Sequence, residues 1–437
     1  MFDLPGDWSE SELRKAVQKG RLSFTDGDWI EASYIASSGI RLLQTGNIGR
    51  GFVNDKPETR RYISLKTFGE LGCKWVRHGD ILICRLADPI GRACEIPEHL
   101  DKSITSVDVT ILRVDPSEYS ARYVLHYLNS EINLRLAADS AGGSTRSRIS
   151  RTNLGKLPLP NPPLAQQKKI AEVFDTLDTQ IQKTEALIAK LEKVKEGLLH
   201  DLLTRGIDEN GQLRPSPEQA PELYKESSLG LIPREWEVAS VDEVGDIVTG
   251  STPPSAATNS WGGPHLFFTP ADIGDYEPLK VSERTLSESG AKHVRLIPEE
   301  AILVVCIGST IGKVGITSGA GATNQQINSV IPSPKWSNYF VYQAIRHHVG
   351  QIHAWAGLQA VPIVNKSTFG KMLIPQPQTD EQNRIAKSMQ ALDERVSEER
   401  IAVGKLREEK TGLMDDLLTG RVRVTSLLEQ AQEPATA

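Results

Sequence analysis

Apolar residues recur at alternating steps of three and four in two separate stretches of the chain. The first stretch places them at Ile170, Phe174, Leu177, Ile181, Ile188, Leu191, Leu198 and Leu202. The second places them at Ile385, Met389, Leu392, Val396, Val403, Leu406, Leu413 and Leu417. A 3.5-residue period over about five heptads is typical of coiled-coil helices, and prolines just before each stretch end any helix upstream. Each stretch therefore predicts a long helix, about 57 Å long for residues 166–203.

The two predicted helices belong to one internal repeat. Shifting the chain by 215 positions places residues 155–204 on residues 370–419 without a gap, and D-L-L-T closes both copies. Upstream segments match more loosely but in the same order, as in the strand-like I-L-I-C at Ile81 and I-L-V-V-C at Ile302. The repeat indicates a duplicated unit and the order globular, helix, globular, helix.

This organisation predicts an α+β fold in which two globular α/β domains alternate with two long helices in a pseudo-twofold repeat. A chain of 437 residues is long enough for about three domains. The predicted parts are a first globular domain (1–155), a central conserved region with its helix (156–205), an extended linker (206–230), a second globular domain (231–370), a C-terminal conserved region with its helix (371–424) and a tail (425–437).

Polar residues interrupt the heptads at the same positions in both copies, with Thr184 and Lys195 in the first and Glu399 and Lys410 in the second. Polar positions in a coiled-coil seam usually fix its register. Parallel pairing would stack Lys195 on Lys410, whereas antiparallel pairing can place Lys195 against Glu399 and Thr184 near Lys410. We therefore expect an antiparallel coiled coil in this register. A distance above about 10 Å between Lys195 and Glu399 would contradict it.

The composition is ordinary for a soluble globular protein, with 39% hydrophobic and 24% charged residues. No apolar run approaches the roughly 20 residues that cross a bilayer, and residues 1–20 lack the apolar core of a secretory signal. We therefore expect a cytoplasmic protein without a membrane partner. The absence of a C-x-x-C pair argues against a zinc ribbon or a disulfide framework and favours core thiols for Cys73, Cys84, Cys94 and Cys306.

Positive charge is segregated along the chain, although the formal net charge is -6. No acidic residue occurs between Glu300 and Asp380, where lysine, arginine and histidine do occur, and residues 140–171 form a weaker basic stretch. Contacts to phosphate need local lysine and arginine. The two stretches favour a nucleic-acid partner, which the net charge alone would argue against.

Several motifs resemble those of the specificity subunits of type I restriction-modification systems, and the resemblance covers nearly the whole chain. Residues 10–40 open the first domain with a less typical sequence. The motifs are P-L-P-N-P-P-L-A-Q-Q-K-K-I-A (158–171) with L-L-H-D-L-L-T (198–204), I-P-Q-P-Q-T-D-E-Q-N-R-I-A (374–386) with L-M-D-D-L-L-T-G (413–420), and V-T-G-S-T-P-P (248–254) with F-T-P-A-D-I (268–273).

The resemblance implies a non-catalytic subunit with no cofactor or metal of its own, in a bacterial or archaeal cytoplasm. Its two target-recognition domains would each read one half of an asymmetric, interrupted site in double-stranded DNA. Two methyltransferase subunits, which contain the S-adenosylmethionine chemistry, would dock on it, and two restriction subunits can join them.

Two similar but unequal readers on a rigid spacer also require a bipartite site, because each presents different side chains to the base edges. Half-sites on the same side of B-DNA lie about one turn, or ~10 bp, apart, and helices of about 57 Å limit the reach to about 17 bp.

Candidate DNA contacts come from three kinds of segment. The loop G-G-S-T-R-S-R-I-S-R combines flexible residues with clustered arginine, which suits groove or backbone contact. Its counterpart in the second copy, residues 357–366, and the run T-N-Q-Q at 323–326 contain amides. Amide side chains can read bases or hold a loop together. The predicted contacts are Asn47, Arg92, Arg146, Arg148, Arg151, Ser251, Thr252, Lys313, Gln325, Gln326, Gln359 and Lys366.

Three motifs suggest other chemistry less well. N-P-P-L at 161–164 lacks the aromatic residue of adenine methyltransferases, and G-S-T-I-G-K-V at 308–314 is one residue short of a P-loop and lacks its Ser or Thr. His347, His348 and His353 have no nearby carboxylate or cysteine, so packing or phosphate proximity is favoured over a metal site.

Two other classes of protein stay open as alternatives. A coiled-coil structural protein with protein-binding domains would not explain the acid-free stretches. A stand-alone endonuclease or methyltransferase would need a PD-(D/E)XK-like cluster or a cofactor loop.

Overall fold

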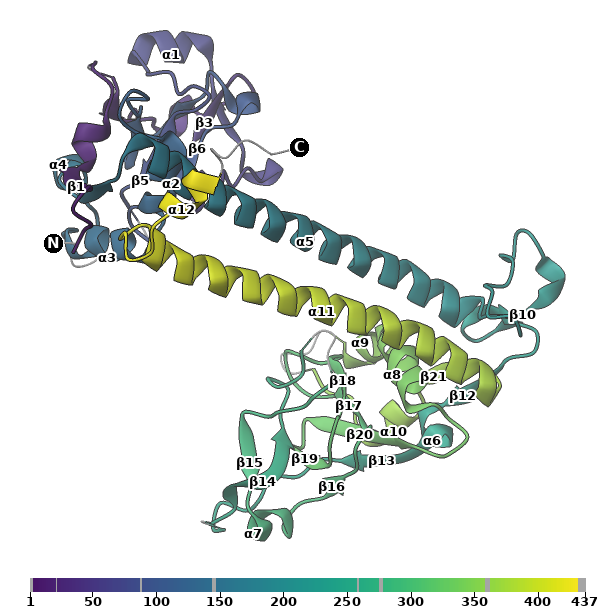
Figure 1. Ribbon diagram of the computed structural model, residues 1–437. Helices are drawn as coiled ribbons and strands as arrows, with labels where there is room; N and C mark the ends of the chain where they lie inside the picture. The colour runs from purple at the N-terminus through teal and green to yellow at the C-terminus, as the bar shows by residue number, and fades with distance from the viewer. Residues whose placement is uncertain are drawn as a thin grey trace, which may run out of the picture. The chain divides into compact units, whose positions relative to one another are not determined.

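The computed structural model describes residues 3–20, 22–86, 89–143, 147–257, 259–274, 278–357 and 362–430, and the chain divides into two compact units. Unit 1 comprises residues 1–183 and 403–437, and unit 2 comprises residues 184–402. The boundaries fall inside the two long helices, α5 (Leu164–Thr204) and α11 (Thr379–Leu417), so each unit contains part of both (Figure 1). The two helices predicted from the heptads are confirmed.

The elements of unit 1 are short. Its strands are β1 (Ser9–Glu12), β2 (Phe24–Asp26), β3 (Ile40–Leu43), β4 (Arg61–Ile63), β5 (Ile81–Cys84), β6 (Ala93–Glu95), β7 (Ile104–Thr105), β8 (Val109–Leu112) and β9 (Pro158–Asn161). Its other helices are α1 (Leu65–Leu71), α2 (Ala121–Leu128), α3 (Glu131–Asp139), α4 (Arg151–Gly155) and α12 (Thr425–Gln430). Its 3-10 turns are η1 (Leu13–Ala16), η2 (Ala32–Tyr34), η3 (Thr45–Asn47), η4 (Pro57–Thr59) and η5 (Glu98–Leu100).

Unit 2 contains a similar series. Its strands are β10 (Tyr224–Ser227), β11 (Gly230–Pro233), β12 (Glu237–Ser240), β13 (Gly245–Thr249), β14 (Trp261–Phe268), β15 (Arg284–Leu286), β16 (Leu296–Ile297), β17 (Ile302–Val305), β18 (Val314–Ile316), β19 (Gly321–Thr323), β20 (Ile327–Pro332) and β21 (Leu373–Gln376). Its other helices are η6 (Pro221–Leu223), α6 (Val241–Val244), α7 (Glu288–Ala291), α8 (Asn338–His347), α9 (Gly350–Ala356) and α10 (Lys366–Gly370).

The sheets of the two units follow the same plan. The antiparallel order β2-β8-β5-β6 of unit 1 corresponds to β13-β20-β17-β18 of unit 2. Strand β3 pairs parallel with β7 as β14 does with β19, and β1 pairs antiparallel with β9 as β12 does with β21. The predicted strands at Ile81 and Ile302 are β5 and β17. The repeat in the sequence is thus a repeat of the fold.

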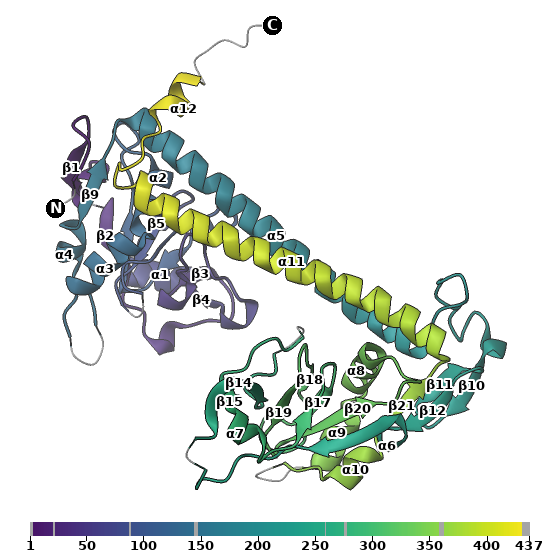
Figure 2. The ribbon, with the colours of Figure 1, turned by 60° about the horizontal axis from the view of Figure 1, so that its bottom comes forward.

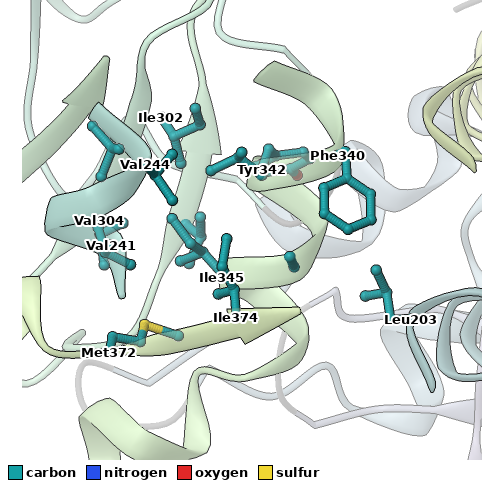
Figure 3. Packing of buried hydrophobic residues seen from close by; sticks show 14 of the residues in the cluster. Leu203, Val241, Val244, Ile302, Val304, Phe340, Tyr342, Ile345, Met372 and Ile374 are labelled. Atoms are coloured by element: carbon teal, nitrogen blue, oxygen red, sulfur yellow. The ribbon is translucent and has the colours of Figure 1, made fainter. Parts of the chain in front are cut away.

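Each unit has an apolar core between its sheet and the helices that follow it. In unit 2, residues of β17, α6 and β21 meet α8 and the end of α5, with Ile302, Val244, Ile374, Phe340 and Leu203 among the buried residues (Figure 3). Unit 1 buries β5, β8, α2 and the start of α5 in the same way. The four cysteines are buried free thiols, as expected.

The long helices contact each other inside each unit through ion pairs. In unit 2, Lys195 pairs with Asp393 and Glu192 lies 2.7 Å from Arg400. Rising numbers in α5 thus meet falling numbers in α11, so these helix segments run antiparallel (Figure 2). In unit 1 the equivalent lysine of α11, Lys410, lies 2.5 Å from an aspartate of α5.

The predicted register of the polar residues is wrong. Lys195 pairs with Asp393, six residues before Glu399, and Glu399 lies 2.7 Å from Arg395 of its own helix. Lys410 correspondingly pairs with Asp178, six residues before Thr184. The heptad pattern marks the face that meets the other helix, and in unit 2 a third helix also contacts the acidic partner. In unit 2 that helix is α8, whose Tyr339 and Gln343 donate hydrogen bonds to Asp393.

The connector 206–230, which we expected to be extended, is folded. Ile207 and Leu213 form a β-bridge, and β10 and β11 form an antiparallel hairpin. Arg214 lies 2.5 Å from Glu381 at the start of α11. Burial of the side chains of Ile207 and Tyr224 explains why this polar segment stays folded. No helix in the described residues is long and apolar enough to cross a membrane.

Candidate nucleic-acid interface

One basic side chain holds an equivalent loop in each unit. In unit 1, Arg92 donates hydrogen bonds to the carbonyls of Thr45 at 2.9 Å and Ile48 at 2.7 Å. In unit 2, Lys313 donates to the carbonyl of Ile273 at 3.0 Å. The glycine before each basic residue has φ of 90°, a backbone region that favours glycine. The resulting turn directs the cation back onto the loop.

A side chain with a carbonyl or carboxylate oxygen closes the same loops. Asn47 is buried, accepts a hydrogen bond from the Gln44 amide at 2.9 Å and donates to the Asn54 carbonyl at 2.9 Å. In unit 2, Asp272 accepts from the Thr269 amide at 2.7 Å. Asn47, Arg92 and Lys313 are among the predicted DNA contacts. The structure bonds Asn47 and the two basic residues within the protein, where they shape these loops, and their contacts to DNA stay predictions.

The predicted arginines of unit 1 lie around two aspartates. Arg148 lies 2.5 Å from Asp108, and Arg151 lies 3.6 Å from Asp26, while both arginine side chains stay 46% exposed. Arg85, at the end of β5, is buried and lies 3.1 Å from Asp26. Sequence reasoning placed Arg148 and Arg151 on one loop, but it missed the arginine beneath them.

Four predicted residues of unit 2 lie at the ends of β13 and β19. The hydroxyl of Thr252 donates to the side-chain oxygen of Gln325 at 3.0 Å, and both residues are exposed. Ser251 accepts from a backbone amide at 3.2 Å, and the Gln326 side chain accepts from a neighbouring asparagine at 2.9 Å. The structure therefore brings Thr252 and Gln325 together on the surface and uses Gln326 to hold the turn.

Arg151 and Lys366 occupy equivalent positions in the repeat. Each is exposed and is the first residue of a short helix, α4 or α10, after a side-chain cap. The predicted contacts Arg146 and Gln359, in the segments before these helices, lie outside the described residues. The equivalence shows that both copies present a cation at this place.

Arg14 also belongs to this surface of unit 1, although sequence reasoning missed it. Pairing of β1 with β9 brings it beside α4, where Arg14 and Arg151 line a pocket of about 520 Å³. The looser upstream repeat contained a signal for Arg14. The segment L-R-K-A in η1 of unit 1 aligns with V-D-E-V in α6 of unit 2, so the two copies differ in charge at this place.

The motifs that suggested other chemistry have structural roles. N-P-P-L links β9 to α5, and the lysine of the P-loop-like segment is Lys313, which binds loop carbonyls. His347 and His348 pack with ring centroids 4.9 Å apart. Within the described part of the chain, no group of three or more His, Cys, Asp or Glu side chains could hold a metal ion.

His348 is expected to make unit 2 less stable in acid. Burial and the neighbouring His347 lower the pKa of His348 to about 4. The unfolded chain binds this proton at about pH 6.5, so stability is lost as pH falls from about 6.5 towards 4, by up to about 3 kcal/mol. Urea unfolding at pH 7 and pH 4.5 should show a smaller acid loss for His348→Gln than for wild type. The exposed His353→Gln is the control, and an equal acid loss in all three proteins would contradict the prediction.

Known proteins share this duplicated arrangement. A family model described as the type I restriction modification DNA specificity domain matches residues 33–193 and again residues 233–403. A Methanocaldococcus jannaschii protein, provisionally named as the MjaX type I restriction enzyme specificity subunit, is 26% identical over 444 residues, which cover 97% of this chain and 95% of that protein. The HindI specificity subunit of Haemophilus influenzae is 24% identical over 404 residues, which cover 80% of this chain and 88% of that protein.

A solved structure has the same fold. The crystal structure of the type I restriction-modification S subunit from M. genitalium matches with a TM-score of 0.61 and 14% identity, over 95% of this chain and 96% of that one. Each matched family segment spans a globular part and most of a long helix, which defines a protein with a duplicated DNA specificity domain. The chain belongs to the family of type I restriction modification DNA specificity domain proteins.

Proposed function

We propose that this chain is the DNA specificity subunit of a type I restriction-modification complex. Unit 1 reads one half of a bipartite, asymmetric DNA site and unit 2 reads the other half. One observation supports this most strongly: the two units repeat one fold but present different side chains at equivalent positions. The bridge that joins Leu86 to Arg148 in unit 1 joins Ile307 to Ile363 in unit 2. Different side chains on the same scaffold contact different base sequences.

The long helices set the gap between the half-sites. We infer that α5 and α11 pair along their whole length as an antiparallel coiled coil. Two equivalent ion pairs, Lys195 with Asp393 and Lys410 with Asp178, support this pairing. A helix of 41 residues is about 60 Å long, which limits the reach of the two readers to about 17 bp of DNA.

The chemistry resides in partner subunits. Two methyltransferase subunits, which bind S-adenosylmethionine, dock on the charged outer faces of the helices, and two restriction subunits join the complex. This chain contributes no catalysis of its own and works in the cytoplasm. The names of its relatives, which are specificity subunits of type I restriction enzymes, support this division of roles.

The methylated DNA sequence tests this function directly. Genomic DNA methylated by the chain with its methyltransferase subunit is expected to show two unlike half-sites around an unspecified gap. Inserting four residues after Lys183 and four after Ala402 lengthens both helices by about 6 Å, and the gap should lengthen while both half-sites stay the same. Insertion of four residues after Glu209 in the connector is the control and should leave the gap unchanged. An unaltered gap in the helix variant would contradict the spacing role.

A further inference from the structure

Unit 1 has a concentrated basic surface beside α4. Arg14, Lys15, Arg148 and Arg151 are exposed or half exposed there and are called the basic face. Neither Arg14 nor Lys15 forms an ion pair with a residue that the structure describes, whereas Arg148 and Arg151 each lie near one aspartate.

The local charge around the basic face is not neutralised. Arg85 is buried behind it and lies 3.1 Å from Asp26. Burial lowers the pKa of Arg85, and although Asp26 opposes this shift, the charges of Arg148 and Arg151 add to it. Three of the five cations, Arg85, Arg148 and Arg151, thus share two carboxylates, those of Asp26 and Asp108.

A pocket opens into the basic face. It has a volume of about 520 Å³, and the residues that line it include Arg14, Arg151, Gln18 and Thr25. The Gln18 amide is fixed in place by a 2.9 Å hydrogen bond to a backbone carbonyl. Arginine binds phosphate oxygens through paired N–H groups, so two such side chains around one pocket suit an oxyanion.

The positions of unit 2 that are equivalent to the basic face contain fewer cations. A β-carbon on Gly155 would lie 3.4 Å from Cβ of Arg14, and one on the equivalent Gly370 would lie 3.3 Å from Cβ of Asp242. The next residue is Lys15 in unit 1 and Glu243 in unit 2. Five further positions correspond between the units. Arg85 corresponds to Cys306, Arg148 to Ile363 and Arg151 to Lys366. Asp108 corresponds to Gln326, and Asp26 corresponds to Thr249. One cation and two carboxylates therefore stand where unit 1 has five cations and two carboxylates.

We propose that the basic face of unit 1 binds the phosphodiester backbone of duplex DNA and that unit 2 has no matching backbone site. The inference rests on the proposed function, because it assigns a further contact to the same DNA. Unit 1 thereby anchors the complex without regard to sequence, while the rest of each unit reads bases.

The salt dependence of DNA binding tests this site. The full-length chain is titrated by fluorescence anisotropy onto a 40-bp duplex of arbitrary sequence between 50 and 300 mM KCl. For Arg14→Ala/Arg151→Ala, the slope of log affinity against log salt is expected to become less negative by about 1.8, because each lost phosphate contact changes it by about 0.9. Lys66→Ala/Lys102→Ala removes two exposed cations elsewhere in unit 1 and is expected to leave the slope within about 0.3 of wild type.

Each other outcome has a definite meaning. Equal changes in both double variants would show a general charge effect and overturn the inference. An unchanged slope in Arg14→Ala/Arg151→Ala, with or without a loss of methyltransferase binding, would also overturn it and leave the proposed function standing. If wild type shows no salt-dependent binding to DNA and no sequence-specific methylation with its partner, the proposed function itself fails. Circular dichroism spectra equal to wild type confirm that the variants are folded.

Discussion

Replacing Asp393 with alanine is expected to lower the free energy of unfolding by about 3–5 kcal/mol, because it leaves a buried lysine without its counter-charge. The side chains of Lys195 and Asp393 are 5% and 11% exposed. Burial lowers the pKa of Lys195 although the bond to Asp393 opposes the shift, so the folded protein holds this cation at a cost that the aspartate offsets. Asp393 also accepts hydrogen bonds from Tyr339 and Gln343 of α8, which lose their acceptor in the variant.

The repeat supplies a matched control for this variant. Asp178→Ala removes the equivalent carboxylate in unit 1, where Asp178 and Lys410 are 29% and 22% exposed, and the expected loss is only about 1 kcal/mol. Urea unfolding of the full-length chain measures both losses, and hydrogen exchange assigns them to a unit. Lys195→Met/Asp393→Asn removes both charges and is expected to recover most of the stability. Equal losses for Asp393→Ala and Asp178→Ala would show that burial does not decide the strength of these pairs.

Replacing Glu381 with alanine is expected to lower the free energy of unfolding by about 3–5 kcal/mol. The change leaves the buried Trp236 indole and Ile207 amide without an acceptor and removes the carboxylate that pairs with Arg214. Glu381 is 4% exposed and accepts from the Trp236 indole at 3.0 Å, the Ile207 amide at 2.9 Å and Arg214 at 2.5 Å. These bonds join the start of α11 to the connector and to the strand region of unit 2. Loss of the carboxylate should therefore loosen the connector as well as lower stability.

The equivalent junction of unit 1 uses a neutral acceptor. Gln166 accepts from the Trp8 indole at 2.9 Å and from Arg423 at 3.4 Å, and it donates to Asp7 at 3.2 Å. The charge of Arg423 is paired with Asp7 and not with Gln166. Gln166→Ala is therefore expected to cost about 1–2 kcal/mol, less than Glu381→Ala, in the same urea unfolding measurement. Glu381→Gln should fall between the two. A loss from Gln166→Ala as large as that from Glu381→Ala would contradict the role given to the charge.

Local sequence pattern was sufficient for the helices, the repeat and the family. A heptad run extends over many residues and depends only on which side chains are apolar, so it predicts a helix without knowledge of distant contacts. The strands at Ile81 and Ile302 were found for the same reason, as short apolar runs after which the chain turns. The cations Arg151 and Lys366 were found because basic residues stand out in segments that lack acidic ones.

Contacts between distant segments decided the rest. The seam pairs Lys195 with Asp393, an aspartate that also accepts hydrogen bonds from two residues of α8, and heptad spacing does not contain this information. Arg92 bonds carbonyls more than 40 residues away along the chain, at Thr45 and Ile48, and its position in the sequence does not reveal these partners. Arg14 became part of a basic surface only when β1 paired with β9. The sequence alone determined which segments are helical, repeated and basic, because those properties are local, whereas the partner of each charged side chain was settled by which backbone segments the fold brings together.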